Sequence, residues 1–246
     1  MEIRAIQERL LQVGKEVVKI LDRHDIPYML AYGTLLGAVR HQGFIPWDDD
    51  FDLYLFDESY DEAIEYLRKE LPDMLFLEDE QSEPLYFHGW AHVKDTKSEA
   101  VCEAFPQDSA YAHKGLSVDL YRIKKVPKCD LWSYINSENR DYIKRRYEKG
   151  LLNTEEYKER MRKIEETEST CVNDPDSRLV YGLISTYACK YIECDDVLPL
   201  KKLTFEDVEF YCPNKAELVL TKIYGDYMKL PPVEKRLSHY SNVEFF

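Results

Sequence analysis

The stretch GFIPWDDDFDLYLF, residues 43–56, places four carboxylates within five positions and then continues as an apolar segment. Like charges this close raise one another's pKa and repel unless a cation or hydrogen-bond donors compensate. Polar and apolar positions alternate in DFDLYLF, which predicts a strand with Asp50 and Asp52 on one face. We therefore expect a positively charged partner at the start of this strand.

The residues before this strand predict a helix, a strand and a second helix. Residues 3–22 carry apolar side chains at three- and four-residue steps, which is typical of an amphipathic helix. PYMLAY, residues 27–32, has the length of a short strand, and Gly33 and Thr34 follow it before LLGAVR turns helical. We expect a tight turn at Gly33 and Thr34, where backbone N–H groups and a hydroxyl can receive a phosphate.

The residues after this strand predict more elements of both kinds. A helix is expected over 59–71, with Ser59 as N-cap and Glu62 completing a capping box. LYFHGWAHVKD and GLSVDLYRI are strand candidates, and the second places Asp119 between two apolar residues. Charged helices with solvated faces are expected from Asp130 to about Lys190.

The C-terminal part predicts a hairpin at LTFEDVEFYCP, a helix at KAELVLTKIYGDYM and a proline-broken exit at LPPVEKR. We expect a core at 1–126, a charged helical region at 127–195, and a hairpin and helix returning to the core at 196–246.

Composition limits the partners. The 246 residues are 44% hydrophobic and include 19 Tyr, 10 Phe and 3 Trp, enough for a sizeable core. The net charge is -14 and the sequence has no dense basic block, so we expect no nucleic-acid partner.

The sequence also indicates a compartment. No apolar run approaches the roughly 20 residues that cross a bilayer, and the first residues are charged, unlike a signal peptide. The six cysteines form no C-x-x-C pair and fit reduced packing residues. We expect a cytoplasmic protein without an integral membrane segment, which could lie peripherally at the inner face of the membrane.

The carboxylates favour a magnesium or manganese site over a calcium loop or an acidic turn without a ligand. Magnesium takes a few carboxylates together with the phosphate oxygens of a substrate, and Asp50, Asp52 and Asp119 could supply such a half-shell. An EF-hand starting at Asp48 fails because Leu53 and Ser59 replace the required Gly and Glu. The spacing of the aspartate-rich motif of prenyl-diphosphate enzymes also occurs, but the predicted loop and strand argue against those helical proteins. A solvated acidic turn does not explain Asp52 inside an apolar strand.

A second possible metal group consists of His88, His92, Cys102 and His113. Histidine and thiolate suit zinc, and residues four apart on a strand share a face. Their spacing follows no known zinc-finger pattern, so packing roles are the favoured interpretation.

The run YGTLLGAVRHQGFIPWDDDFDL, residues 32–53, resembles the signature of the LicD/fukutin family of phosphotransferases. GLSVDLYRI resembles the strand that carries the family's third aspartate, and residues 198–236 are similar to its C-terminal block. The resemblance implies an α+β fold: a nucleotidyltransferase-like mixed β-sheet flanked by helices, here with a helical insertion. It implies transfer of a phosphoalcohol such as phosphocholine from a CDP-linked donor to a glycan hydroxyl, with release of CMP. Bacterial members decorate lipopolysaccharide, teichoic acid or capsule, so the acceptor would be a glycan or a lipid-linked oligosaccharide.

Carried over by motif, Gly33 and Thr34 correspond to the phosphate-cradling turn, Asp50 and Asp52 to the metal-binding pair, and Asp119 to the third carboxylate. Asp119 would complete a second metal position or accept the proton of the attacking hydroxyl.

Further candidates for substrate binding have structural alternatives. Arg40 could stabilise the leaving CMP, and His41 could assist or be a hydrogen-bonded structural histidine. For Trp47, a packing role is favoured over stacking on cytosine. Three cations could also reach phosphates, although each is more often a surface residue: Lys94, Lys229 and Arg236.

Two other function classes remain open. Nucleotide-sugar glycosyltransferases also use a D-x-D pair and a divalent metal on an α/β scaffold. A non-catalytic module that binds phosphorylated glycans would not need Asp119.

Overall fold

The main sheet of the computed structural model is mixed. Within the residues that the structure describes, 3–103, 105–127, 131–169, 179–185 and 188–246, this sheet has seven strands. Five follow the order β1-β2-β6-β4-β3, while β7 pairs with β6 and β8 pairs with β7. Only the β2–β6 pair among these described strands is parallel. The strands are β1 (Tyr28–Leu30), β2 (Asp52–Phe56), β3 (Leu75–Glu78), β4 (Ala91–Asp95), β6 (Ser117–Pro127), β7 (Leu179–Ser185) and β8 (Ala188–Glu193).

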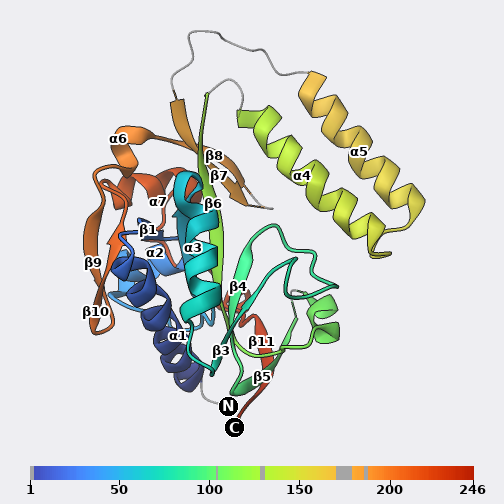
Figure 1. Cartoon of the computed structure of the whole chain (residues 1–246). Helices are drawn as coiled ribbons and strands as arrows, with labels where there is room; N and C mark the ends of the chain where they lie inside the picture. The colour runs from blue at the N-terminus through green and yellow to red at the C-terminus, as the bar shows by residue number, and fades with distance from the viewer. Residues whose placement is uncertain (1–2, 104, 128–130, 170–178, 186–187) are drawn as a thin grey trace.

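Strand β6 lies in the middle of the sheet (Figure 1), and β2 lies between β6 and β1. All five residues of β2 are buried, although its sequence alternates polar and apolar residues. Burial on both faces is expected for a strand whose sheet is covered on both sides. The side chain of Asp52 is therefore carried into the interior by the core on either side of it.

Helices α1 (Ile3–Arg23) and α3 (Asp57–Glu70) cover one face of the sheet (Figure 1). Leu10, Val17 and Leu21 of α1 have no exposed surface, so the amphipathic helix predicted from the sequence is confirmed. The predicted cap at Ser59 is wrong. Helix α3 begins two residues earlier, and the Ser59 hydroxyl donates to the carbonyl of Phe56. Asp57 and Glu58 in its first turn suit the positive end of the helix dipole instead.

Helix α2 (Tyr32–His41) lies between the sheet and the C-terminal part of the chain. It begins at Tyr32, so Gly33 and Thr34 lie in its first turn rather than in a turn before it. Helix α7 (Ala216–Tyr224) and strand β9 (Lys201–Phe205), which pairs with β10 (Val208–Cys212), both contact this helix.

An aromatic cluster joins these parts to the sheet. Phe51 contacts Phe205 and Phe210, which come from the β9–β10 hairpin, with ring centroids 5.4 and 5.5 Å away. All three side chains are fully buried. The hairpin and helix predicted for the C-terminal part are confirmed, and the hairpin packs on the residue that precedes Asp52.

The region after β6 differs from the sequence prediction. Helices α4 (Leu131–Glu148) and α5 (Thr154–Ser169) form the expected charged hairpin beside one end of the sheet (Figure 1). The expectation of helix up to Lys190 is wrong, because residues 179–185 and 188–193 are strands β7 and β8. Strand β7 pairs with the last four residues of β6, and Val126 and Val180 are register partners. This pairing, which the local charge pattern does not reveal, extends the sheet.

The remaining elements are short. Strand β5 pairs with the C-terminal strand β11, so the end of the chain returns to the body of the protein. None of the described helices is long and apolar enough to cross a membrane. Three cysteines at described positions form no disulfide bond: Cys102, Cys194 and Cys212. The bounds are β5 (Ser98–Cys102), a 3₁₀ helix (Pro106–Ala110), α6 (Cys194–Val197), a second 3₁₀ helix (Val233–Lys235) and β11 (Tyr240–Phe245).

Asp196 of α6 connects to helix α7 through two lysines. Its buried carboxylate accepts hydrogen bonds from Lys215 at 2.8 Å and Lys222 at 3.0 Å, which lower its pKa. A lowered pKa in the folded state contributes stability above the unfolded-state pKa of about 4, and this contribution is lost as pH falls through the folded-state pKa. We predict that Asp196→Asn lowers the free energy of unfolding by about 1 kcal/mol at pH 7 and less at pH 3. Urea titrations with the exposed neighbour Asp195→Asn as control check this, and an equal loss at both pH values contradicts it.

Candidate active site

The backbone places Asp52 beside Asp119. The two residues are register partners in the parallel β2–β6 pair, and the amide of Asp119 donates to the carbonyl of Phe51 at 3.0 Å. The amide of Asp52 donates to the Thr34 hydroxyl oxygen at 2.8 Å, which fixes the first turn of α2 against the start of β2. The predicted adjacency of the two aspartate strands is therefore confirmed. The sequence predicted that the Thr34 hydroxyl receives a phosphate. In the structure its oxygen accepts the hydrogen bond from the amide of Asp52.

Gly33 allows two further carboxylates to approach helix α2. A Cβ atom at this position would lie 2.8 Å from Oδ2 of Asp48 and 3.5 Å from Oδ1 of Asp50. The first contact is shorter than real Cβ atoms show, so a side chain would displace Asp48. The glycine at position 33 is thus required by the close approach of the acidic loop to the helix.

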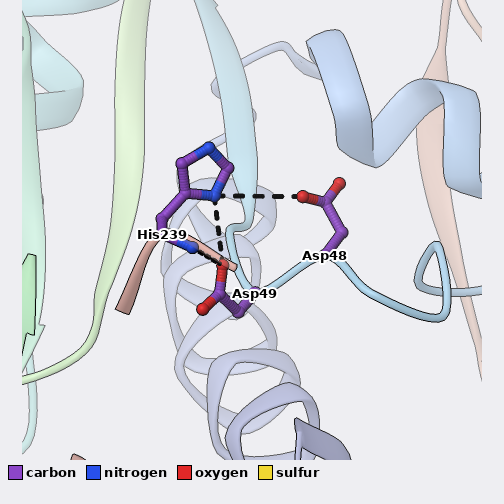
Figure 2. Close-up of side chains that lie close together, drawn as sticks. All are labelled: Asp48, Asp49 and His239. Atoms are coloured by element: carbon purple, nitrogen blue, oxygen red, sulfur yellow. Dashed lines mark hydrogen bonds and ion pairs between the residues drawn. The ribbon is translucent and has the colours of Figure 1, made fainter. Parts of the chain in front are cut away.

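Asp49 holds the C-terminal segment against the acidic loop. Its carboxylate has no exposed surface and accepts backbone hydrogen bonds from His239 at 2.7 Å and Tyr240 at 3.0 Å. The hydroxyl of Ser238 also donates to it, as does Nδ1 of His239 (Figure 2). Burial alone would raise the pKa of Asp49, but the hydrogen bonds from His239 and Ser238 lower it. Asp49 therefore stays ionised and connects two segments 190 residues apart.

His239 supplies positive charge at the acidic loop. Its Nδ1 lies 3.1 Å from Asp49, 3.6 Å from Asp50 and 4.0 Å from Asp48. The hydrogen bond with Asp49, together with the other nearby carboxylates, raises the pKa of His239 to about 9. The positive partner predicted for this loop is thus, in part, a histidine from the end of the chain.

The positive charge of His239 does not neutralise all the carboxylates of residues 48–52. Burial raises the pKa of Asp48 to about 6. Burial, with repulsion from neighbouring carboxylates, raises the pKa of both Asp50 and Asp52 well above the ordinary value. Oδ1 of Asp50 is buried without a hydrogen-bond partner. This unsatisfied oxygen is the type of ligand that a hard divalent cation takes.

The structure also contains a compact metal-ligating group. Among the described residues, ligand atoms of Asp48, Asp49 and His239 lie within 4.8 Å of one another. Both oxygens of Asp49 already accept hydrogen bonds, so this residue is better suited to hold His239 than to bind an ion. Asp48 belongs to the same cluster as Asp50, since both approach Gly33 and Nδ1 of His239.

Asp119 is oriented by aromatic hydrogen-bond donors. Trp90 Nε1 donates to its Oδ2 at 2.9 Å, and the Tyr121 hydroxyl donates to the same oxygen at 3.3 Å. Burial raises the pKa of Asp119, and the charge of Lys94 and these hydrogen bonds reduce the effect. Its Oδ1 lies 3.6 Å from Nε2 of His92. Asp119 thus has more support from donors than Asp50 or Asp52.

A buried polar chain lies behind Asp119. His92 is neutral, since burial lowers its pKa well below the ordinary value, and its Nδ1 lies 3.3 Å from Glu78. Lys94 lies 3.8 Å from the same carboxylate and is only 4% exposed, so it is not the surface cation expected from the sequence. Burial raises the pKa of Glu78 to about 7.

Aromatic rings line the same end of the sheet. The ring of Tyr121 lies 4.9 Å from Trp90, 5.1 Å from Tyr32 and 6.2 Å from Tyr54 between centroids. Since Trp90 and Tyr121 both donate to Asp119, this aromatic cluster borders the carboxylates.

The other predicted binding residues lie around the C-terminal end of α2. Arg40 donates to the Tyr227 carbonyl at 2.6 Å and to His41 at 2.9 Å. Trp47 packs between the ring of His41 and the guanidinium of Arg236, which lies 4.5 Å from the ring centroid. Lys229 is exposed. The structure therefore gives Arg40, His41 and Trp47 intramolecular partners.

The structure does not assemble the four residues of the zinc hypothesis. His88 lies 2.9 Å from Asp108, His92 contacts Glu78, and the ring of His113 packs on Phe76. In the described part of the chain, the set Asp48, Asp49 and His239 is the group with metal-ligating geometry.

Sequence reasoning missed His239 and the role of Asp49. A lone histidine in the segment SHY carries no local signal, and its partners lie 190 residues earlier in the sequence. The available signal was the excess of carboxylates in the 48–52 run, which required a positive partner without identifying it.

Comparisons with known proteins relate the chain to a family of transferases. The family model for the LicD/FKTN/FKRP nucleotidyltransferase domain matches residues 25–150. The chain is 25% identical over 248 aligned residues to the lipopolysaccharide cholinephosphotransferase LicD of Haemophilus influenzae, covering 90% of this chain and 89% of the relative. It is 40% identical over 57 residues to the human ribitol 5-phosphate transferase FKRP, covering 23% of this chain and 11% of the relative.

We predict that Asp49→Ala lowers the free energy of unfolding by about 3 kcal/mol, because it removes the hydrogen bonds that Ser238, His239 and Tyr240 donate to a buried, ionised carboxylate. The C-terminal segment should also become sensitive to limited proteolysis. Urea denaturation and mass spectrometry of the cleavage products measure both effects. Asp207→Ala, which removes an exposed ion pair with Lys15, is the control and should change little. Wild-type stability in Asp49→Ala would contradict the proposed connection.

Proposed function

Because this chain belongs to the LicD/fukutin family of phosphotransferases, we propose that it transfers a phosphoalcohol from a CDP-linked donor to a glycan hydroxyl and releases CMP. The observation that carries this proposal is the pairing of Asp52 with Asp119, in register on parallel strands, with Asp50 close enough for its charge to raise the pKa of Asp52. We further propose that the mixed sheet and its helices, which make an α+β structure, are a nucleotidyltransferase-like fold with 127–195 as an insertion.

The acidic residues fit a divalent metal ion, and magnesium or manganese is proposed. Asp50 and Asp52 would hold it, since Asp52 is buried and a buried oxygen of Asp50 has no hydrogen-bond partner. When bound, such an ion neutralises charge on the diphosphate of the donor.

The residues of the chain have distinct roles in this proposal. The acceptor hydroxyl attacks the phosphorus that carries the alcohol, the bond from this phosphorus to the CMP oxygen breaks, and Asp119 takes the hydroxyl proton. Trp90 and Tyr121 orient Asp119 for this step through their hydrogen bonds. Gly33 leaves room for the acidic loop, and the charge of Arg40 acts on Asp48 from the other end of α2.

The rings of Trp90, Tyr121 and Tyr32 favour choline over ribitol as the donor alcohol; these are the two alcohols in the relatives' names. A quaternary ammonium offers no hydrogen bonds and is held by the faces of Trp and Tyr rings, whereas ribitol requires several hydrogen-bond partners. Trp90, Tyr121 and Tyr32 lie beside Asp119, where the donor would react. The acceptor is proposed to be a cell-surface glycan, as in lipopolysaccharide, or a lipid-linked precursor of one, with the 127–195 region contributing to its selection.

A donor panel tests the proposal. We predict magnesium-dependent CMP release from CDP-choline, with lower kcat/KM for CDP-ethanolamine, CDP-glycerol and CDP-ribitol, in the presence of candidate glycans. The three methyl groups of choline gain contact with aromatic faces that the polyols do not exploit. Turnover of nucleotide sugars instead would indicate a glycosyltransferase. Binding of phosphorylated glycans without any turnover would indicate a non-catalytic module.

Asp52 and Asp119 should act as one unit. We predict that Asp52→Asn and Asp119→Asn each lower kcat by about a thousandfold or more, and that the double variant is hardly slower, because either loss already disables the site. Kinetics of the four proteins measure this. Losses that multiply would show two independent roles.

The same variants separate metal binding from folding. Without metal, Asp52→Asn should be at least as stable as wild type, because it removes repulsion from the neighbouring carboxylates. Magnesium should raise the melting temperature of wild type more than that of Asp52→Asn. Equal increases would remove Asp52 from the metal site.

A further inference from the structure

The 228–237 segment, MKLPPVEKRL, presents large apolar side chains to solvent. The exposed fractions are 58% for Met228, 45% for Leu230, 72% for Val233 and 71% for Leu237. Scattered apolar residues are normal on a protein surface, but four within ten residues form a concentration that usually marks an interaction site.

The ends of this segment are anchored to the candidate active site. The carbonyl of Tyr227, just before it, accepts a hydrogen bond from Arg40. Ser238 and His239, just after it, donate to Asp49, and Arg236 within it lies over Trp47. The apolar side chains are therefore displayed from a framework fixed at both ends, so little conformational freedom remains to be lost on binding.

The charge of the segment differs in sign from that of the whole chain. It contains Lys229, Lys235 and Arg236 but a single carboxylate, Glu234, whereas the chain has 47 acidic and 33 basic residues. Lys229 and Lys235 are exposed, and neither forms an ion pair with a described residue. Because charges farther than about 8 Å are largely screened at physiological salt, the local cations decide which surface can approach.

From these observations we infer that the 228–237 segment docks on an anionic lipid surface. The apolar side chains enter the interface while the lysines contact headgroups. A deformable lipid interface suits side chains that project from an irregular, proline-containing segment, whereas a second protein copy would need a matching rigid surface. Docking would bring the carboxylate cluster close to the membrane, and, given the proposed function, close to an acceptor carried on a lipid.

Vesicle sedimentation tests the inference without any substrate. The full chain is mixed with vesicles of phosphatidylcholine alone or with phosphatidylglycerol added, at physiological salt. We expect binding to the mixed vesicles and weak binding to the neutral ones. The double variant Val233→Ser/Leu237→Ser should bind about tenfold more weakly or worse, and Lys235→Gln roughly fivefold more weakly on the mixed vesicles.

Met74→Ser is the matched control, since Met74 is 44% exposed in a different part of the chain and should leave binding unchanged. Melting temperatures establish that each variant folds. Absence of binding to mixed vesicles, or equal binding by the double variant, overturns the inference. Self-association in ultracentrifugation that the double variant abolishes also overturns it, because the segment would then be a contact between copies. A failed donor panel leaves the vesicle result standing, so the two proposals are tested separately.

Discussion

The parallel pairing of β2 with β6 is the interaction on which the candidate site depends. It joins Asp52 to Asp119 across 67 residues of sequence and does so through backbone register rather than through the carboxylates, which repel each other. The stabilising free energy comes from the buried residues on either side, including Phe51, Leu53 and Leu120, none of which has exposed surface. The core therefore holds together charges that would separate on their own.

The carboxylates of the site have different surroundings and therefore suit different tasks. Asp49 is saturated by donors from residues 238–240, which lower its pKa and fix the loop, whereas burial raises the pKa of Asp48 and Asp50. Asp119 accepts hydrogen bonds from Trp90 and Tyr121, while a buried oxygen of Asp50 has no donor. The fixed orientation of Asp119 suits a residue that takes a proton. The unpaired oxygen of Asp50 suits a residue that binds a cation.

The sequence by itself determined the elements that depend on local patterns. The amphipathic helix at 3–23, the strands that contain Asp52 and Asp119, and the β9–β10 hairpin follow from apolar spacing and turn residues. The motif residues around the acidic loop indicated the family, and the crowding of the carboxylates indicated a missing positive charge. These features are encoded within a few neighbouring residues, where burial of one face is enough to select the structure.

Only the tertiary structure decided the contacts between distant segments. It identified His239 as a cation at the acidic loop, buried Lys94 beside Glu78, and used β7 to extend the sheet along the end of β6. It also placed His88 and His92 side by side, with ring centroids 4.6 Å apart, but packed His113 on Phe76. The physical reason is that hydrogen-bond partners, burial and strand pairing are properties of the packed chain, and a local pattern shows only that a residue needs a partner.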